Sequence, residues 1–431
     1  MAASNSSTEQ LWLNRHITNF QLRLGNLKAL SLVTPDGPST QRDVARELGE
    51  VLGRTVNPGA SPRFLNLEGY IAAKESLGSE RIERSSLELQ DVYLSDVRMP
   101  SNLGAVPLKA VHVLVDWGVW LGLVSDTYGN TPYTQLLDRL VGTERRWFDG
   151  YAPGQNPYML SESQKLFFLY TWLSFDGGLI RRLLPKLAGL KSFDRTEAVG
   201  PFREALEELL GELEKVDITR QDAGESAALA KLAEALREEV EREKADSQYR
   251  ALTGIQRLST RLEVLVDLGF LQNTSDEGDG LKLAFKYKAT EATKRLARSL
   301  DKLGDKGRTE SDRFEWFLSG AFFGETASVI GKRAKKIADH ETLFSQFCTA
   351  YSEFPAEVGP RLIKPISLLA AVRALSSGSG FFELSDMKPA LVDFRDSHPE
   401  QVALSAGHER GVAEFVQISP GLVEKYAGRK H

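Results

Sequence analysis

The heptapeptide "VLVDWGV" at residues 113–119 returns as "VLVDLGF" at residues 264–270. Five of the seven letters are identical, and the last pair are both large apolar residues. Upstream of each copy, a helical pattern ends in an Asp-Gly turn, at Gly37 and at Gly178, and a short second helix follows. The repeat therefore covers a whole unit of three helices, not a single motif.

The second copy has the clearer surroundings. "GIQRLSTRLEVLVDLG" at 254–269 places its apolar residues at helical spacing, and Gly269 stands where a helix end favours left-handed backbone. After "FLQN" and a polar, glycine-bearing turn, "LKLAFKYKAT" at 281–290 alternates between apolar residues and lysine or alanine, which is typical of a half-buried strand. We expect a third helix followed by a strand–turn–strand hairpin.

The first copy predicts the same order in a looser form, and the C-terminus predicts it again. "PLKAVHVLVDWG" at 107–118 indicates a helix, "VWLGLVS" at 119–125 a strand, and "TPYTQLLDRLV" at 131–141 a further helix. Near the C-terminus we expect three successive helices and a strand. Their sequences are "ISLLAAVRALSSGSG" at 366–380, "SDMKPALVDFRDS" at 385–397, "HPEQVALSAGHERG" at 398–411 and "VAEFVQIS" at 412–419.

Helix, turn, helix, third helix and hairpin together resemble the winged helix-turn-helix superfamily. The resemblance implies a mainly α fold with small β-wings, arranged as tandem winged-helix domains. Members often bind DNA through the third helix and the wing, and many serve only as protein–protein modules. The predicted organisation is unit 1 at 1–145 with an insertion at about 54–103, unit 2 at 146–310 with an insertion at about 191–247, a helical linker at 311–360, and unit 3 at 361–431.

Charge is unevenly distributed behind a net charge of −5. From Asp194 to Asp246 there are 16 acidic and 8 basic residues, in sequence typical of a helical hairpin inserted in unit 2. Such an acidic hairpin packs on its own domain or, alternatively, docks another subunit, and it is a poor DNA surface. From Leu281 to Arg308 there are 9 basic and 3 acidic residues, a pattern that favours phosphate contact.

Double-stranded DNA is therefore the expected partner, contacted mainly by unit 2. Short polar and arginine side chains of a third helix can enter a groove while wing lysines neutralise phosphates. The alternative is that the lysines are only the solvated face of an exposed hairpin. The candidate residues are Arg257, Ser259, Thr260 and Arg261 on the third helix, Lys282, Lys286 and Lys288 on the wing, and Lys294 and Arg295 on the helix that follows.

Catalytic and metal-binding patterns are not apparent in the sequence. "GETASVIGK" at 324–332 departs from the phosphate-loop spacing, and "RAKKIADH" at 333–340 matches an Arg-x6-His spacing similar to the HEPN ribonuclease superfamily but is better interpreted as a basic amphipathic helix. The six histidines form no short metal-ligand spacing. We expect no catalytic residue, no metal and no cofactor.

Neither a secretion signal nor a membrane span is visible, and a single cysteine, Cys348, fits a reducing cytoplasm. The leading interpretation is a non-enzymatic DNA-binding regulator or DNA-handling subunit. The runner-up is an interaction scaffold, such as a kleisin-like partner of an SMC-type ATPase or an accessory subunit of a prokaryotic antiviral defence complex. Protein partners would bind the acidic insertion and the C-terminal unit. A nuclease with an unrecognised site is a third alternative.

Overall fold

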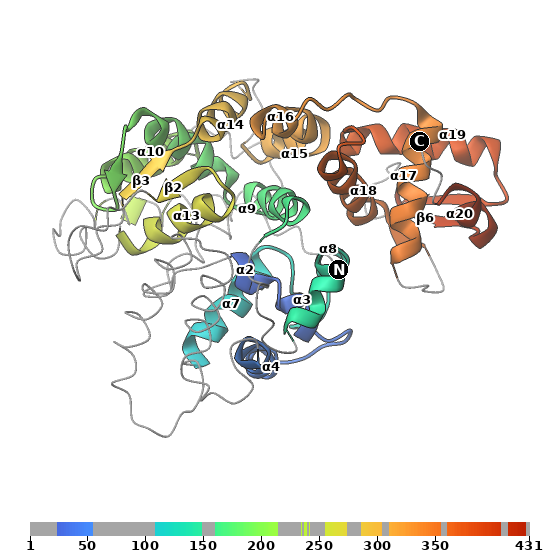
Figure 1. The fold of residues 1–431 in the computed structure, drawn as a ribbon, viewed down its shortest axis with the longest axis horizontal. Coiled ribbons are helices and arrows are strands. Elements are labelled where there is room, and N and C mark those ends of the chain that lie inside the picture. Colours follow the sequence, from blue (N-terminus) through green and yellow to red (C-terminus); the bar gives the residue numbers. More distant parts are fainter. Residues whose placement is uncertain are drawn as a thin grey trace. The chain divides into compact units, whose positions relative to one another are not determined.

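The computed structural model describes residues 24–54, 108–148, 160–213, 255–273, 286–303, 310–354, 360–406 and 413–427, with isolated positions 234, 237, 238 and 241 (Figure 1). Of these residues 68% are helical, so helix packing forms most of the core, and two small three-stranded antiparallel sheets complete it. The predicted mainly α class with small sheets is confirmed at this level. Two compact units result, comprising 1–131, 141–160 and 171–302 in the first and 132–140, 161–170 and 303–431 in the second.

The N-terminal part of the first unit is helical. Its elements are α2 (Leu24–Leu27), α3 (Leu30–Val33), α4 (Gln41–Arg54) and α7 (Leu108–Trp120). α4 packs against α3 and α7, with Leu48, Leu114 and Val115 buried between neighbouring helices. The predicted strand at 119–125 is wrong. α7 continues to Trp120, Gly122 turns the chain with φ of 71°, and the buried side chains that follow are consecutive instead of alternating.

The rest of the first unit is built around a sheet. Its elements are the later part of α9 (Glu162–Gly189), β1 (Phe193–Asp194), α10 (Val199–Leu213), α13 (Ile255–Asp267), β2 (Leu271–Asn273), β3 (Lys286–Ala289) and α14 (Glu291–Asp301). β3 lies between β1 and β2 and is antiparallel to both, with Phe193 opposite Tyr287 and Leu271 opposite Ala289. Gly269 has φ of 84° at the end of α13, which confirms the predicted helix stop and hairpin.

The two helices predicted on either side of the Asp-Gly turn at 176–178 form one kinked helix, α9. Its backbone departs from helical geometry at Asp176, where φ is −118° and ψ is 16°. The Asp176 carboxylate is buried and paired with Arg261, whereas an ordinary surface turn would leave it in water. The predicted break between two helices is therefore present as the kink at Asp176.

The predicted acidic insertion at 191–247 is wrong for residues 191–213. Phe193 lies in the central sheet, and Phe202, Leu206 and Leu209 of α10 are each at most 5% exposed. α10 packs against α13 and is a core helix with an acidic outer face, because its leucines share one side. Apart from the four isolated positions, the remainder of the predicted insertion lies outside the described residues.

The second unit contains the other sheet. It includes most of α8 (Pro132–Val141) and the start of α9; the 3-10 helix η3 (Gly142–Phe148), which follows α8, belongs to the first unit. Its other elements are α15 (Glu310–Gly320), α16 (Phe322–Val329), α17 (His340–Glu353), β4 (Arg361–Leu362), α18 (Ile363–Ser377), α19 (Leu384–Ser397), β5 (Val402–Ala406), β6 (Ala413–Ile418) and α20 (Pro420–Tyr426). β6 lies between β4 and β5 and is antiparallel to both.

Two predictions for this unit are wrong. The segment 398–411 holds no helix in its described part. It contains β5, because Val402 and Leu404 are two positions apart, and period two is the spacing of a strand. α17, which falls in the predicted linker at 311–360, packs against α18, α19 and α20. α17 is therefore the first helix of this sheet-bearing group.

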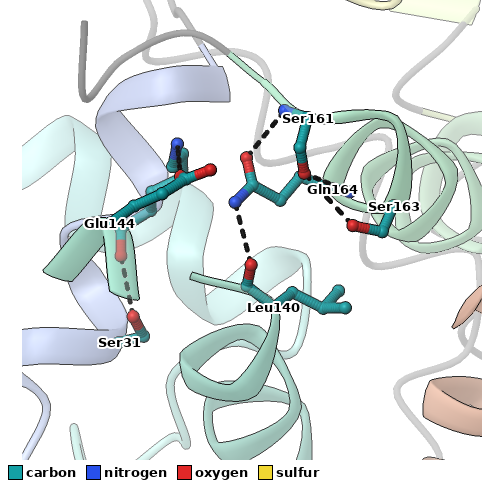
Figure 2. A network of polar contacts seen from close by, with 7 residues as sticks. Ser31, Leu140, Glu144, Ser161, Ser163 and Gln164 are labelled. Carbon is teal, nitrogen blue, oxygen red and sulfur yellow. Dashed lines mark hydrogen bonds and ion pairs between the residues drawn. The ribbon is translucent and has the colours of Figure 1, made fainter. Parts of the chain in front are cut away.

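The junction between α8 and α9 is fixed by a buried glutamine. The Gln164 amide donates to the carbonyl oxygen of Leu140 at 3.0 Å and accepts from the backbone N–H of Ser161 at 3.0 Å (Figure 2). Ser161 and Ser163 share a further hydrogen bond at 3.1 Å. One side chain thus holds the end of one helix against the start of the next. No helix within the described ranges is long and apolar enough to cross a membrane.

Candidate nucleic-acid interface

α13 is the helix that the sequence predicted as the third of unit 2, and it buries two of the four residues predicted to reach a DNA groove. Thr260 and Arg261 are each 2% exposed. The Arg261 guanidinium donates to both carboxylate oxygens of Asp176, at 2.6 and 3.2 Å, and lies over the ring of Phe202. The prediction that Thr260 and Arg261 contact a DNA groove is therefore wrong. Arg257 and Ser259 belong to α13, but their side chains lie outside the described part.

The acidic residues of α13 are also buried and satisfied. Glu263 accepts a hydrogen bond from the hydroxyl of Tyr287 at 2.7 Å, and the guanidinium of Arg195 lies 3.5 Å away. Asp267 accepts from the backbone N–H of Leu24, in α2, at 2.9 Å. From Thr260 to Leu268 every side chain is buried. α13 is therefore a core helix packed on several sides, and this stretch offers no polar face to a partner.

Burial also determines the electrostatics of the Asp176 pair. Desolvation raises the pKa of Asp176 above its ordinary value, and the opposing effect of Arg261 does not fully cancel it. For the Asp176–Arg261 pair, the cost of desolvation therefore offsets much of the Coulomb attraction between the two charges. Its effect is to hold α9 and α13 in one arrangement.

Exposed positive charge in the described part of the first unit lies on β3 and α14, which are in contact (Figure 1). Lys286 and Lys288 are exposed on one side of β3, while Tyr287 between them is fully buried. Lys282 lies outside the described residues. α14 buries Thr293, Leu296, Ala297, Ser299 and Leu300 and turns its basic residues outward. We call the following set the β3–α14 surface: Lys286, Lys288, Lys294, Arg295, Arg298 and Lys302.

Arg298 and Lys302 were not among the predicted contact residues. The signal was present in the sequence, because they follow Lys294 at intervals of four and so share one helical face. Lys294 also bonds Glu291 at 2.7 Å and lowers the pKa of that carboxyl. The six basic residues of the surface therefore outnumber the two acidic residues of the same stretch, Glu291 and Asp301.

The start of α14 is held by a capping box. The Thr290 hydroxyl accepts from the backbone N–H of Thr293, and the Thr293 hydroxyl accepts from the backbone N–H of Thr290 at 3.2 Å. The backbone N–H of Thr290 also donates to the carbonyl oxygen of Phe270 at 3.0 Å. These bonds fix the first turn of α14 to the chain that follows Gly269, so the basic face has a defined position relative to the sheet.

α19, the helix of the second unit that corresponds to α13, has a different surface. Its exposed and half-exposed charges have mixed sign, with Arg395 bonded to Asp396 at 2.7 Å and Asp386 bonded to Lys336 at 3.0 Å. Asp393 is bonded to the imidazole of His340. This mixture is a poor match to a phosphate backbone.

The predicted basic helix at 333–340 is wrong. α16 ends at Val329, Gly331 adopts φ of 74°, and α17 begins only at His340, so the intervening residues are not helical. Arg333 and His340 therefore do not share a helix face. Burial raises the pKa of the Cys348 thiol to about 12, which leaves it a poor nucleophile. Among the described residues no cluster of histidine, cysteine and carboxylate side chains is placed to hold a metal.

Comparisons with protein-family models, with curated proteins and with solved structures found no match for this chain. The functional argument therefore depends on the surfaces just described.

Proposed function

We propose that this chain is a non-enzymatic protein that binds the backbone of double-stranded DNA through the β3–α14 surface, on a scaffold of tandem winged-helix domains. The order of elements supports the scaffold. In the sheet-bearing group of each unit the described elements are, in order, a helix, a strand, two helices and two strands, and the third strand lies between the first and second. This is the order of helices and hairpin that the winged-helix resemblance implies.

The charge of the β3–α14 surface is the observation that carries the proposal. Between Lys286 and Lys302 there are six basic residues against two acidic ones, Glu291 and Asp301. Lysine and arginine that neutralise phosphates release condensed counterions, and this release provides most of the affinity of sequence-independent binding. A basic strand followed directly by a basic helix face offers several such contacts on adjoining elements.

Burial of α13 from Thr260 onward determines the kind of recognition that we propose. Sequence is read at base edges by side chains that enter a groove. The stretch from Thr260 to Leu268 has no side chain free to do so. Binding should therefore depend on salt far more than on sequence, as suits a subunit that holds DNA for a larger assembly.

A scaffold that binds protein is the second candidate, favoured by the surface of α19. The near balance of charges on that helix suits a protein partner better than a phosphate backbone. The two candidates are compatible, since the first unit would hold DNA while the C-terminal unit docks a protein. A cytoplasmic location, consistent with one buried cysteine, belongs to the same proposal.

The test is fluorescence anisotropy with labelled duplex DNA of random sequence across a salt series. In the variant Lys286→Ala/Lys288→Ala/Arg298→Ala, we expect weaker binding to every sequence. The slope of log K against log salt should fall by about 2.7, because each phosphate contact contributes roughly 0.9. The charge-matched control is Arg42→Ala/Lys364→Ala/Lys425→Ala, which removes three exposed cations elsewhere.

The control should bind like the wild type, and all three proteins should keep the same thermal midpoint, since surface substitutions rarely affect stability. If Lys286→Ala/Lys288→Ala/Arg298→Ala is folded and binds DNA with unchanged affinity and salt slope, the β3–α14 surface does not contact DNA. The scaffold function would then become the better proposal.

A further inference from the structure

A second basic segment lies between α16 and α17, on the other unit. The sequence from Gly331 to Ala338 contains four basic residues, Lys332, Arg333, Lys335 and Lys336, and no acidic residue. We call residues 332–336, which hold these four cations, the 332–336 segment. It is anchored by a parallel bridge in which the backbone N–H of Ile337 donates to Phe381 at 2.7 Å and that of Phe381 donates to Lys335 at 3.0 Å.

A glycine allows this close approach. Gly380 has φ of 142°, and a Cβ there would lie 2.8 Å from the carbonyl oxygen of Lys335 and 2.8 Å from the side chain of Ile337. Only glycine fits that backbone and that space. The segment is therefore positioned against the serine- and glycine-containing loop at the end of α18, even though it forms no helix.

Two of the four cations are used within the fold. The Lys332 ammonium donates to the carbonyl oxygens of Leu375 and Ser376, at 3.1 and 2.7 Å, and pairs with Glu162 at 2.6 Å. Lys336 pairs with Asp386 at 3.0 Å. By occupying carbonyls at the C-terminus of α18, Lys332 also masks the negative end of that helix, which would otherwise repel an anion.

The other two cations are not used in this way. Arg333 and Lys335 are exposed, and neither side chain has an ion-pair partner within the described ranges of the chain. Ser377 and Ser379 are exposed on the neighbouring loop, where their hydroxyl groups are bonded to each other at 2.9 Å. Two exposed cations on a backbone held by hydrogen bonds suit a phosphodiester.

We infer that Arg333 and Lys335 contact the DNA backbone as a second, sequence-independent site, separate from the β3–α14 surface. The inference rests on the proposed function, because it assigns the same ligand to the second unit. It adds that each of the two compact units carries its own contact with the DNA backbone.

The experiment compares Arg333→Gln/Lys335→Gln with wild type in the full chain, using the same duplex and salt series. Two lost phosphate contacts should reduce the salt slope by about 1.8 and weaken binding by roughly ten- to a hundredfold near 0.1 M salt. The matched control, Lys364→Gln/Lys425→Gln, removes two exposed lysines of the same unit and should leave both quantities unchanged. The charge-conserving swap Arg333→Lys/Lys335→Arg should retain most of the slope.

The failures are distinguishable. Wild-type protein that does not bind duplex DNA would overturn both the proposed function and this inference. Wild-type binding that is weakened by Lys286→Ala/Lys288→Ala/Arg298→Ala but is unchanged in the folded Arg333→Gln/Lys335→Gln variant would overturn this inference alone. A third outcome concerns phosphatidylserine vesicles. If wild type binds them and Arg333→Gln/Lys335→Gln does not, while its DNA binding is unchanged, the inference is likewise overturned and a membrane surface is the ligand.

Discussion

The two sheet-bearing groups share a strand order and differ in what their third helices face. In the first unit Arg261, Glu263 and Asp267 of α13 are buried in contacts with α9, β3 and α2. In the second unit α19 keeps its charged residues in pairs that are partly exposed, such as Asp386 with Lys336. The order of elements therefore does not decide whether this helix is available to a partner. Its availability depends on which helices pack around it.

The covering elements differ accordingly. α2 contacts α13, and Asp267 of α13 accepts the first backbone N–H of α2. α15 and α17 contact α19, but its charged residues Lys388, Asp393 and Asp396 remain at least partly exposed. Predictions that follow from this contrast concern stability, and the buried pair should give the largest effect.

Removing the buried arginine should be the most damaging single change. Arg261→Met leaves the Asp176 carboxylate unpaired at 2% exposure, which costs about 3–5 kcal/mol of the free energy of unfolding. The double variant Asp176→Leu/Arg261→Met should recover much of that loss, because no buried charge remains. Urea denaturation followed by circular dichroism measures both variants.

The matched control lies in the second unit. Arg373 donates to both carboxylate oxygens of Glu353, and both side chains are about one third exposed, at 32% and 33%. Arg373→Met should therefore cost no more than about 1 kcal/mol. Equal losses from the two arginine variants would show that burial is not what separates the two groups.

The second prediction concerns α10, which the acidic composition of its surroundings had assigned to an insertion. Leu209 is 2% exposed, so Leu209→Ala should destabilise the protein by about 3 kcal/mol through lost burial and a residual cavity. Glu208→Ala on the exposed face removes a bond to Lys186 and should cost less than about 1 kcal/mol. A Leu209 variant as stable as the Glu208 variant would contradict a core position for α10.

Local patterns in the sequence predicted the parts of the fold that depend on neighbouring residues. Gly269 and the alternation around Tyr287 indicated the end of α13 and the strand that follows it, because turn and strand signals act over a few positions. The sequence of α10 also contains a seam of leucines, but the acidic composition around it predicts an insertion. β5 differs from the predicted helix because its period-two pattern is only five residues long and is a weak signal.

The candidate site was predicted less well, for a reason of distance along the chain. The partner of Arg261 is Asp176, 85 positions away, and nothing near Arg261 in the sequence indicates that its charge is buried. Lys286 and Lys288 flank a buried tyrosine, a local pattern that does predict exposure. Long-range packing thus buries Thr260 and Arg261, whereas Lys286 and Lys288 are exposed as their local pattern predicts.

A smaller effect is expected at the start of α14. Thr290→Ala removes the hydroxyl that accepts from the backbone N–H of Thr293, and loss of such a cap costs about 1 kcal/mol. Thr290→Ser keeps the acceptor and should stay close to wild type. Amide hydrogen exchange in the first turn of α14 should accelerate in the alanine variant alone, and equal exchange in both variants would contradict the capping role.

The smallest effect is expected at the cap of α17 in the other unit, where the capping group titrates. The Asp339 carboxylate accepts from the backbone N–H of Thr342 at 2.8 Å and from its hydroxyl at 2.7 Å, and these bonds lower the pKa of Asp339. A carboxyl whose pKa is lower in the folded state stabilises the fold above its unfolded pKa of about 3.9, and that stabilisation disappears as pH falls through the folded pKa. Asp339→Asn keeps a capping oxygen but cannot titrate.

The thermal midpoints of wild type and Asp339→Asn should therefore differ most near neutral pH, with wild type higher, and converge at about pH 2. Other carboxyl groups titrate equally in the two proteins, so the difference between them isolates residue 339. The neutral cap at Thr290 provides the comparison, since the difference between wild type and Thr290→Ala should vary much less with pH. A gap between wild type and Asp339→Asn that stays constant down to about pH 2 would mean that the ionised carboxylate adds nothing beyond a neutral cap.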